Sequence, residues 1–496
     1  MKNDIFLAFT KEPMYCQTIR HKNVLFLEQG FYDDEYIRNF NLVESPNEFL
    51  YLDYNTDKKI IDQAIMLSSK IIHFMAPAFN KHNGVNYSSD YWLHLMEFWA
   101  VAFLKVLLTD VLLLKRVKAK YKKNNIVACI ANNIHSDVVD YNDFVNKIYK
   151  SYYTVELFGK LIQMPDYNWI NKEYVSIGKT SQVEGRRVYS LSVKNKISDV
   201  WHKYKFAGIC KAIYNKMIKS VYSYDTNKVI FAAYNTPFDS NLTAKLLSKY
   251  KNAFGYISFK DVEFSLQVKK DVALREKLFE ELDKIFDYNA FGDIDKHLLK
   301  IFIGEIPLVY LEGYKDVTLA IKEKSLGIPR YIFSAQGWRN PIFLFWAMMC
   351  SDKYSTKLIG YQHGGNYGFV WMQHEWVDFM YTWGWKHFGQ RTDYIKGTSE
   401  FKMHSYRDVF IEKPKMLNDQ ILFVGTSCDI TNFGPIRYEG SEEYIRGQKE
   451  FFKHLCFRYR KKLLVRNFME DWGWKINGKL QVQIEHRYNQ ETLSIA

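Results

Sequence analysis

A glycine-rich segment at residues 361–368 carries the side chains of this chain that are best suited to chemistry. Its polar and glycine positions are Gln362, His363, Gly364, Gly365 and Asn366. Glycines let the backbone approach a ligand closely, and exposed backbone N–H groups can bind a phosphate or a carboxylate. A histidine beside them can act as a general base on a hydroxyl or donate to a phosphate oxygen. The same residue types also form tight turns, so the spacing alone supports function and structure about equally.

A second group of polar residues follows a short distance along the chain. His374 and Glu375 precede Asp378, and Trp383 and Trp385 come next. A carboxylate so close in sequence could share one cleft with the histidine of the glycine-rich segment. Helix capping is the competing interpretation for the two acids, and core packing is the stronger interpretation for the two tryptophans.

Short apolar runs separated by helical stretches predict parallel α/β layers. The strand candidates are Val24–Leu27, Val229–Tyr234, Tyr331–Ser334, Leu358–Tyr361, Phe379–Thr382, Ile421–Gly425 and Leu463–Arg466. In an open parallel sheet, ligands bind beyond the carboxyl ends of the strands. We therefore expect Leu358–Tyr361 and Phe379–Thr382 to be neighbours, with His363 in an open crevice at their ends.

Two long helices are predicted in the first quarter of the chain. The first has Thr56 as its N-cap and ends at Pro77, and the second begins after cap candidates at residues 88–90. The apolar stretch Tyr91–Leu114 resembles a membrane span in length. Its polar residues, which are costly in hydrocarbon, are His94, Glu97, Lys105 and Asp110. This stretch is therefore expected to be a buried helix of the folded protein.

The net charge of the sequence indicates which classes of binding partner to expect. The net charge of +13 over 496 residues favours anionic partners such as nucleotide phosphates or lipid headgroups. The densest basic cluster is Lys115, Arg116, Lys118, Lys120, Lys122 and Lys123. A helix C-terminus is the simpler interpretation, and peripheral contact with an anionic membrane is the alternative. No zinc-finger, RNA-recognition or basic-heptad pattern is present, so no nucleic-acid partner is expected.

The cysteines and acids do not indicate a metal or cofactor site. The six cysteines are widely scattered without a C-x-x-C pair, which is typical of reduced thiols in a cytoplasmic protein. No compact Asp-x-Asp or His/Cys ligand set is present. The N-terminus lacks a convincing signal peptide. We expect a cytoplasmic protein that needs neither a metal nor a cofactor.

The segment 361–368, followed by Trp383–Trp385, resembles a family of transferases encoded in bacterial O-antigen and other surface-carbohydrate clusters. Further matching pieces, in the same order along the chain, are His82–Asn86, Tyr91–Trp92, Ile306–Pro307, Tyr310–Glu312, Arg466 and Asp471–Trp474. The glycine-rich segment also resembles that of capsule-export polysaccharide enzymes and teichoic-acid polymerases.

The resemblance implies a GT-B-like architecture with two Rossmann-like domains. Residues 1–412 would form a helix-rich α/β domain on the acceptor side, and residues 413–496 a C-terminal domain on the donor side. The family pattern continues with a Thr-Tyr-Asn-Ser-Thr-like segment that is missing after Ile476. We therefore expect an incomplete, truncated C-terminal domain.

The resemblance further implies transfer of a sugar from a nucleotide-activated donor to a glycan or lipid-linked acceptor of a surface polysaccharide. It places His363 in the cleft, and Glu375 is the second catalytic candidate. Substrate binding is assigned to Gln362, Gly364, Gly365, Asn366, Arg339 and Arg466. Two alternatives stay open, namely a phospho-polyol transferase of the teichoic-acid type and a non-catalytic binding subunit of a polysaccharide assembly.

Overall fold

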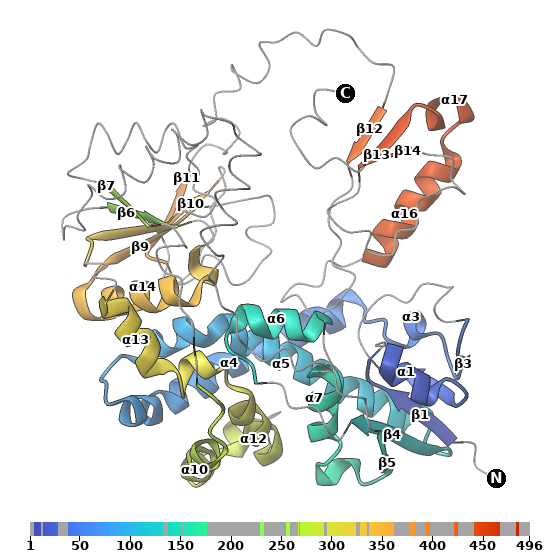
Figure 1. Cartoon of the computed structure of the whole chain (residues 1–496), viewed down its shortest axis with the longest axis horizontal. Coiled ribbons are helices and arrows are strands. Elements are labelled where there is room, and N and C mark those ends of the chain that lie inside the picture. Colours follow the sequence, from blue (N-terminus) through green and yellow to red (C-terminus); the bar gives the residue numbers. More distant parts are fainter. Residues whose placement is uncertain are drawn as a thin grey trace, which may run out of the picture.

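The computed structural model places the chain in three parallel β-sheets and a set of helices (Figure 1). It describes residues 4–10, 13–27, 38–131, 137–150, 153–175, 229–232, 254–257, 266, 268–291, 295–323, 328–334, 337–361, 377–382, 393–396, 421–424, 441–466 and 483–485. The α/β layers predicted from the sequence are confirmed. The segment assigned to one acceptor-side domain, residues 1–412, contains two of the three sheets.

The first sheet is formed by the N-terminal part of the chain. Its strands are β1 (Asp4–Ala8), β2 (Asn23–Phe26), β3 (Asn41–Leu42), β4 (Asn125–Ala131) and β5 (Ile170–Val175). They lie in the order β3-β2-β1-β4-β5, and every pairing is parallel. This is the order of a doubly wound sheet, in which the strand order reverses between β1 and β4.

The second sheet holds the strands that precede the glycine-rich segment. Its strands are β6 (Val229–Ala232), β7 (Phe254–Ile257), β8 (Tyr331–Ser334), β9 (Lys357–Tyr361), β10 (Phe379–Thr382) and β11 (Asp393–Lys396). The order is β11-β10-β9-β8-β6-β7, again parallel throughout, with the reversal between β6 and β8. The predicted neighbours are confirmed, because Ile359 of β9 pairs with Phe379 of β10.

A three-stranded sheet follows near the C-terminus. The parallel strands β12 (Ile421–Val424), β13 (Leu463–Arg466) and β14 (Gln483–Glu485) lie in that order. The helices α16 (Ser441–His454) and α17 (Phe457–Arg460) connect β12 to β13. The buried ring of Phe452 on α16 lies 5.0 Å from the ring of Phe423 on β12, so the helix packs on the sheet.

The helical centre of the molecule is the pair α4 (Tyr54–Asn83) and α5 (Ser89–Lys120), which lie side by side (Figure 1). The predicted boundaries of the first helix were wrong. Asp53 is its N-cap and accepts the Thr56 N–H, and Pro77 lies in the helix interior. A proline there removes one backbone hydrogen bond, but the helix continues because Phe79, beyond the proline, is fully buried in the core.

The ends of α4 and α5 are defined by local signals. Gly84 ends α4 with a left-handed φ of +66°, a conformation that glycine adopts without strain. The predicted cap of the second helix is confirmed, since the Ser88 hydroxyl accepts the Tyr91 N–H at 3.1 Å.

Helix α5 is buried over most of its length, as predicted for this stretch. Its Lys105 ammonium lies 3.5 Å from the Asp57 carboxylate of α4, and both side chains are almost fully buried. Among the described helices, none combines the length and apolarity needed to cross a bilayer.

The basic cluster at residues 115–123 coincides with the C-terminal end of α5, which confirms the simpler interpretation of its position. Arg116 donates to the carbonyl oxygens of Phe49 and Tyr51, and Lys120 forms an ion pair with Glu44 at 2.6 Å. Contact of this cluster with an anionic membrane stays a prediction.

Shorter helices complete the described chain. They are α1 (Pro13–Ile19), α3 (Pro46–Phe49), α6 (Tyr141–Lys150), α7 (Tyr153–Leu161), η1 (Pro165–Tyr167), α10 (Val272–Asp283), α11 (Tyr288–Phe291), α12 (Lys296–Glu305), η3 (Leu308–Tyr310), α13 (Tyr314–Glu323), η4 (Gly337–Arg339) and α14 (Pro341–Tyr354). Helix α5 contacts α6, which follows β4 of the first sheet, and α14, which connects β8 to β9 of the second. One helix thus packs against elements of both sheets.

Candidate functional site

The first candidate site is the carboxyl edge of the second sheet. Strand β9 ends at Tyr361, and the glycine-rich segment begins at the next residue. The predicted residues Gln362, His363, Gly364, Gly365, Asn366 and Glu375 lie outside the described residues. Their roles therefore stay predictions, but the strands that carry the start and the end of this segment are defined.

Gly360 sets the spacing of β9 and β10 just before the segment begins. A Cβ atom at Gly360 would lie 2.7 Å from Met380 Sδ and 3.2 Å from Val377 Cγ2. Both distances are shorter than ordinary van der Waals contact, so β10 approaches closely only because residue 360 lacks a side chain. The strand pair is thus built around this glycine.

Three aromatic side chains lie near the ends of adjacent strands at this edge. The ring of Phe333 on β8 lies 6.0 Å from Tyr361 on β9 and 6.3 Å from Tyr381 on β10. Phe333 and Tyr361 are buried and Tyr381 is half-buried. Such contacts favour a fixed arrangement of the rings, which gives the strand ends an apolar, rigid support.

Arg339 follows the neighbouring strand end and precedes a helix. The Ser334 hydroxyl at the end of β8 accepts the Gly337 N–H at 2.7 Å, and Asn340 caps α14 by accepting the Phe343 N–H. The backbone of Arg339 is therefore held in η4, between β8 and the N-terminus of α14. Because β8 pairs with β9, this turn and the glycine-rich segment both follow strand ends at one edge.

Arg466 belongs to a different sheet. It is the last residue of β13, and its backbone pairs with Val424 of β12 and Glu485 of β14. The carboxyl ends of parallel strands are the usual ligand edge, so Arg466 is positioned at the corresponding edge of the third sheet. The two arginines assigned to substrate binding thus follow or end strands of two different sheets, and their role in binding stays a prediction.

Some pieces that carry the family resemblance have a packing role instead. The Tyr91 and Tyr314 hydroxyls lie 2.8 Å apart, and the Trp92 and Tyr314 rings are 5.0 Å apart. The Trp92 indole N–H donates to Asn80 Oδ1 at 2.9 Å. These side chains join α4, α5 and α13, so Tyr91 and Trp92 stabilise the helical centre.

Glu312, in another of these pieces, balances a buried arginine. The Arg275 guanidinium donates from Nε and Nη2 to the two Glu312 oxygens, each at 2.7 Å. It also donates to the carbonyl oxygens of Ile303, Gly304 and Ile306 at the end of α12. A buried guanidinium needs this full set of acceptors, so Glu312 stabilises the packing of α10 against α12.

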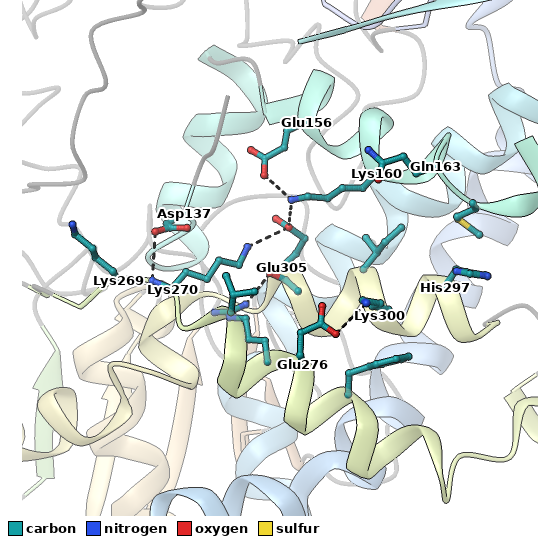
Figure 2. A pocket seen from close by; sticks show the side chains of 16 residues that line it. Asp137, Glu156, Lys160, Gln163, Lys269, Lys270, Glu276, His297, Lys300 and Glu305 are labelled. Atoms are coloured by element: carbon teal, nitrogen blue, oxygen red, sulfur yellow. Dashed lines mark hydrogen bonds and ion pairs between the residues drawn. The ribbon is translucent and has the colours of Figure 1, made fainter. Parts of the chain in front are cut away.

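A second candidate site is a cavity of about 770 Å³ between α7, α10 and α12 (Figure 2). Its lining residues are Asp137, Glu156, Lys160, Gln163, Met164, Lys269, Lys270, Val272, Arg275, Glu276, Phe279, His297, Lys300, Ile301, Gly304 and Glu305. Sequence analysis missed this site, because the lining residues come from four separate segments and form no local motif.

Glu305 is the buried centre of the cavity wall (Figure 2). Its carboxylate accepts from Lys160 Nζ at 2.6 Å and from the Tyr153 hydroxyl at 2.8 Å, and Lys270 Nζ lies 3.5 Å away. Burial alone would raise the pKa of Glu305, but attraction by the two lysines and the hydrogen bonds hold it below its ordinary value. Glu305 is therefore ionised at neutral pH.

Lys160 is the ionised partner of this acid. Burial alone would lower the pKa of Lys160, but Glu305 and Glu156 together raise it above its ordinary value. Its ammonium lies 2.6 Å from a carboxylate oxygen of each. Lys160 and Glu305 are therefore both ionised at neutral pH and compensate each other's charge in the cavity wall.

No metal centre is visible in the ranges that the structure describes, where no three or more His, Cys, Asp or Glu side chains gather in a metal-binding arrangement. The expectation that the chain needs no metal stays a prediction, because the glycine-rich segment and its acid are not among those residues.

The chain was compared with known families and proteins. The model of the LIC12162 family transferase matches residues 5–494, which includes all three sheets, the glycine-rich segment and the cavity. Neither the curated proteins nor the solved structures gave a significant match. Since the match covers nearly the whole chain, the protein belongs to the LIC12162 family of transferases and is an enzyme that transfers a chemical group.

Proposed function

We propose that the protein is a glycosyltransferase of surface-polysaccharide synthesis, with a GT-B-like arrangement of its domains. It would move a sugar from a nucleotide-activated donor to a glycan or lipid-linked acceptor of O-antigen or capsule. The observation that carries the proposal is the pairing of β8, β9 and β10, whose carboxyl ends lead into the Arg339 turn and the glycine-rich segment. This is the edge at which a parallel sheet binds its ligands.

The proposed chemistry is the attack of an acceptor hydroxyl on the anomeric carbon of the donor. His363 takes the hydroxyl proton while the new C–O bond forms. The bond between the anomeric carbon and the phosphate oxygen breaks, and the nucleotide leaves with that electron pair. Backbone amides of Gly364 and Gly365, together with Arg339 or Arg466, stabilise the negative charge on the departing phosphate.

A cytoplasmic location is part of the same proposal. The net charge of +13 supports peripheral contact with anionic lipid on the inner face of the membrane.

The decisive test is His363→Ala assayed with a panel of nucleotide sugars and a cell-envelope glycan fraction as the acceptor. Loss of a general base costs roughly 10²- to 10⁴-fold in turnover, so we expect transfer to fall by about that factor. His454→Ala is the matched control, because this histidine is exposed on α16 and, among the described residues, contacts Glu450 of the same helix. Equal turnover of wild type and His363→Ala would remove the histidine from catalysis.

Product masses and donor binding separate the alternatives in the same assay. A mass increase of one sugar residue supports glycosyl transfer, whereas addition of a phospho-polyol would identify the teichoic-acid type of reaction. A chain that binds no nucleotide sugar by calorimetry, and transfers none, would instead be a binding subunit.

A further inference from the structure

The cavity between α7, α10 and α12 has the size of a small-ligand site. Its volume of about 770 Å³ lies within the roughly 300–1,000 Å³ that such sites occupy. Figure 2 shows the side chains that surround it, with Lys160, Lys270 and Glu305 pointing toward one another. A space of this volume suits a short chain of linked units.

The fixed charges of the cavity nearly cancel. Four carboxylates and five cationic side chains line it, and one of the cations, Arg275, is neutralised by Glu312. Lys160 is paired with Glu156 and Glu305. A polyanion or a dication would meet charges of its own sign along the wall, and repulsion inside a partly buried site is costly. The charge pattern therefore favours an uncharged ligand.

The polar groups nevertheless offer many hydrogen bonds. Glu276 and Lys300 form a partly exposed pair at 3.0 Å along one side (Figure 2). Carboxylates only accept and ammonium groups only donate, so the wall presents both kinds of group. A ligand whose own groups donate and accept alike, such as a saccharide hydroxyl, can use both.

Apolar surface and free space complete the site. Val272, Ile301, Met164 and Phe279 supply apolar wall between the charged groups. A Cβ atom at Gly304 of α12 would have no neighbouring atom within 4 Å, so the cavity has open space beside this glycine. These apolar side chains suit the C–H faces of sugar rings, and the many polar groups beside them suit the hydroxyls.

We propose that this cavity binds an uncharged saccharide chain at a site separate from the strand ends of the second sheet. The identification of this saccharide with the acceptor glycan rests on the proposed function. Binding itself does not, because it needs neither donor nor turnover.

The experiment measures binding of the fluorescently labelled protein to a printed array of neutral oligosaccharides, with calorimetry on the glycans that bind. Gly304→Leu places a side chain in the open space beside residue 304. Val272→Trp adds a large side chain to the cavity wall at the exposed N-terminal end of α10. Gly447→Leu is the matched control, because Gly447 on α16 also has no atom within 4 Å of an added Cβ and lies outside the cavity. Melting temperatures confirm that each variant is folded.

We expect the wild type and Gly447→Leu to bind the same glycans, and at least one of the two cavity variants to bind them at least tenfold more weakly. Three results would overturn the inference. The wild type could bind no glycan, or both folded cavity variants could bind glycans as tightly as the wild type. The protein could also bind inorganic pyrophosphate in a way that the cavity variants abolish. Glycan binding that the cavity variants weaken, without any transfer activity, would refute the proposed function alone. Transfer without such binding would refute this inference alone.

Discussion

Arg275, a buried residue of the cavity wall, meets Glu312 through two parallel hydrogen bonds, each 2.7 Å long. The planar guanidinium matches the carboxylate in a way that an ammonium group cannot. The contact closes α10 against the end of α12, and it therefore stabilises the two helices that form one side of the cavity.

We predict that Arg275→Lys destabilises the protein. A lysine keeps the charge but cannot span both Glu312 oxygens and the three carbonyl oxygens of α12, so buried acceptors lose their partners. The cost should be about 3 kcal/mol, the scale for breaking a buried ion pair, and thermal unfolding would show it as a melting temperature lower by several degrees. Lys81→Ala is the control, because its pair with Glu281 is exposed and is worth under about 1 kcal/mol. Equal melting temperatures for the two variants would contradict the role of Arg275.

A second prediction concerns acid stability. The pKa of Glu305 is lower in the folded protein than its ordinary value of 4.5. Its ionised form therefore contributes stability that is fully present above pH 4.5 and is lost as the pH falls through the folded-state value. Glu305→Gln should melt below the wild type at pH 7, and the difference should shrink when both are compared at pH 3.

The control for this series is Glu276→Gln, which changes a half-exposed carboxylate in the same cavity. Its melting temperature should stay close to that of the wild type at every pH, since exposed pairs contribute little. A difference between Glu305→Gln and the wild type that is constant from pH 7 to pH 3 would show that Glu305 is not ionised in the fold.

Two glycine substitutions should change the stability of the protein in opposite directions. Gly360→Ala adds a methyl group against Met380 and Val377, and overpacking of this kind costs about 1 kcal/mol or more. Gly447→Ala lies in an open, exposed position inside α16, where alanine is favoured by about 0.5–1 kcal/mol. Thermal unfolding should place Gly360→Ala below the wild type and Gly447→Ala at or above it. A rise for Gly360→Ala would mean that β10 yields to the added methyl group.

Cysteine reactivity offers a further test. Burial raises the pKa of Cys129 and of Cys350 to about 12, so both thiols are protonated and inaccessible at neutral pH. Cys16 is also buried, whereas Cys456 is exposed at the start of α17. Mass spectrometry after brief iodoacetamide treatment at pH 7.5 should find Cys456 alkylated well before these three. In denaturant, all four cysteines should be alkylated at equal rates. Early alkylation of Cys129 in the native protein would contradict the packing of β4.

Much of the second sheet could be predicted because its central strands are short apolar runs with clear ends. The run preceding the glycine-rich segment became β9, and the run at Phe379 became β10. Strand β5 could not be found in this way. Among the described strands it pairs with β4 alone, and its residues Asn171, Lys172 and Glu173 are exposed, so it lacks an apolar pattern.

The errors on α4 show where local signals lose to tertiary packing. Asp53 and Thr56 are both good N-cap residues, and the sequence does not decide between them. Pro77 is a strong local stop, but the buried face of α4 continues past it along α5. The cavity was beyond prediction for a related reason, since α7 and α12 meet only through long-range contacts such as that between Lys160 and Glu305.

Helix α5 links the two larger sheets, because it contacts α6, which follows β4, and α14, which connects β8 to β9. Its first turn, with Tyr91 and Trp92, packs against α13, and Phe98 and Phe103 further along pack against Tyr141 and Phe144 of α6. Helix α5 also contacts α14. If the first sheet were expressed without the second, the aromatic residues of α5 would be exposed to solvent, and the exposed apolar surface would promote aggregation. A domain swap or a split of the chain should therefore keep α5 together with both of its neighbours, α6 and α14.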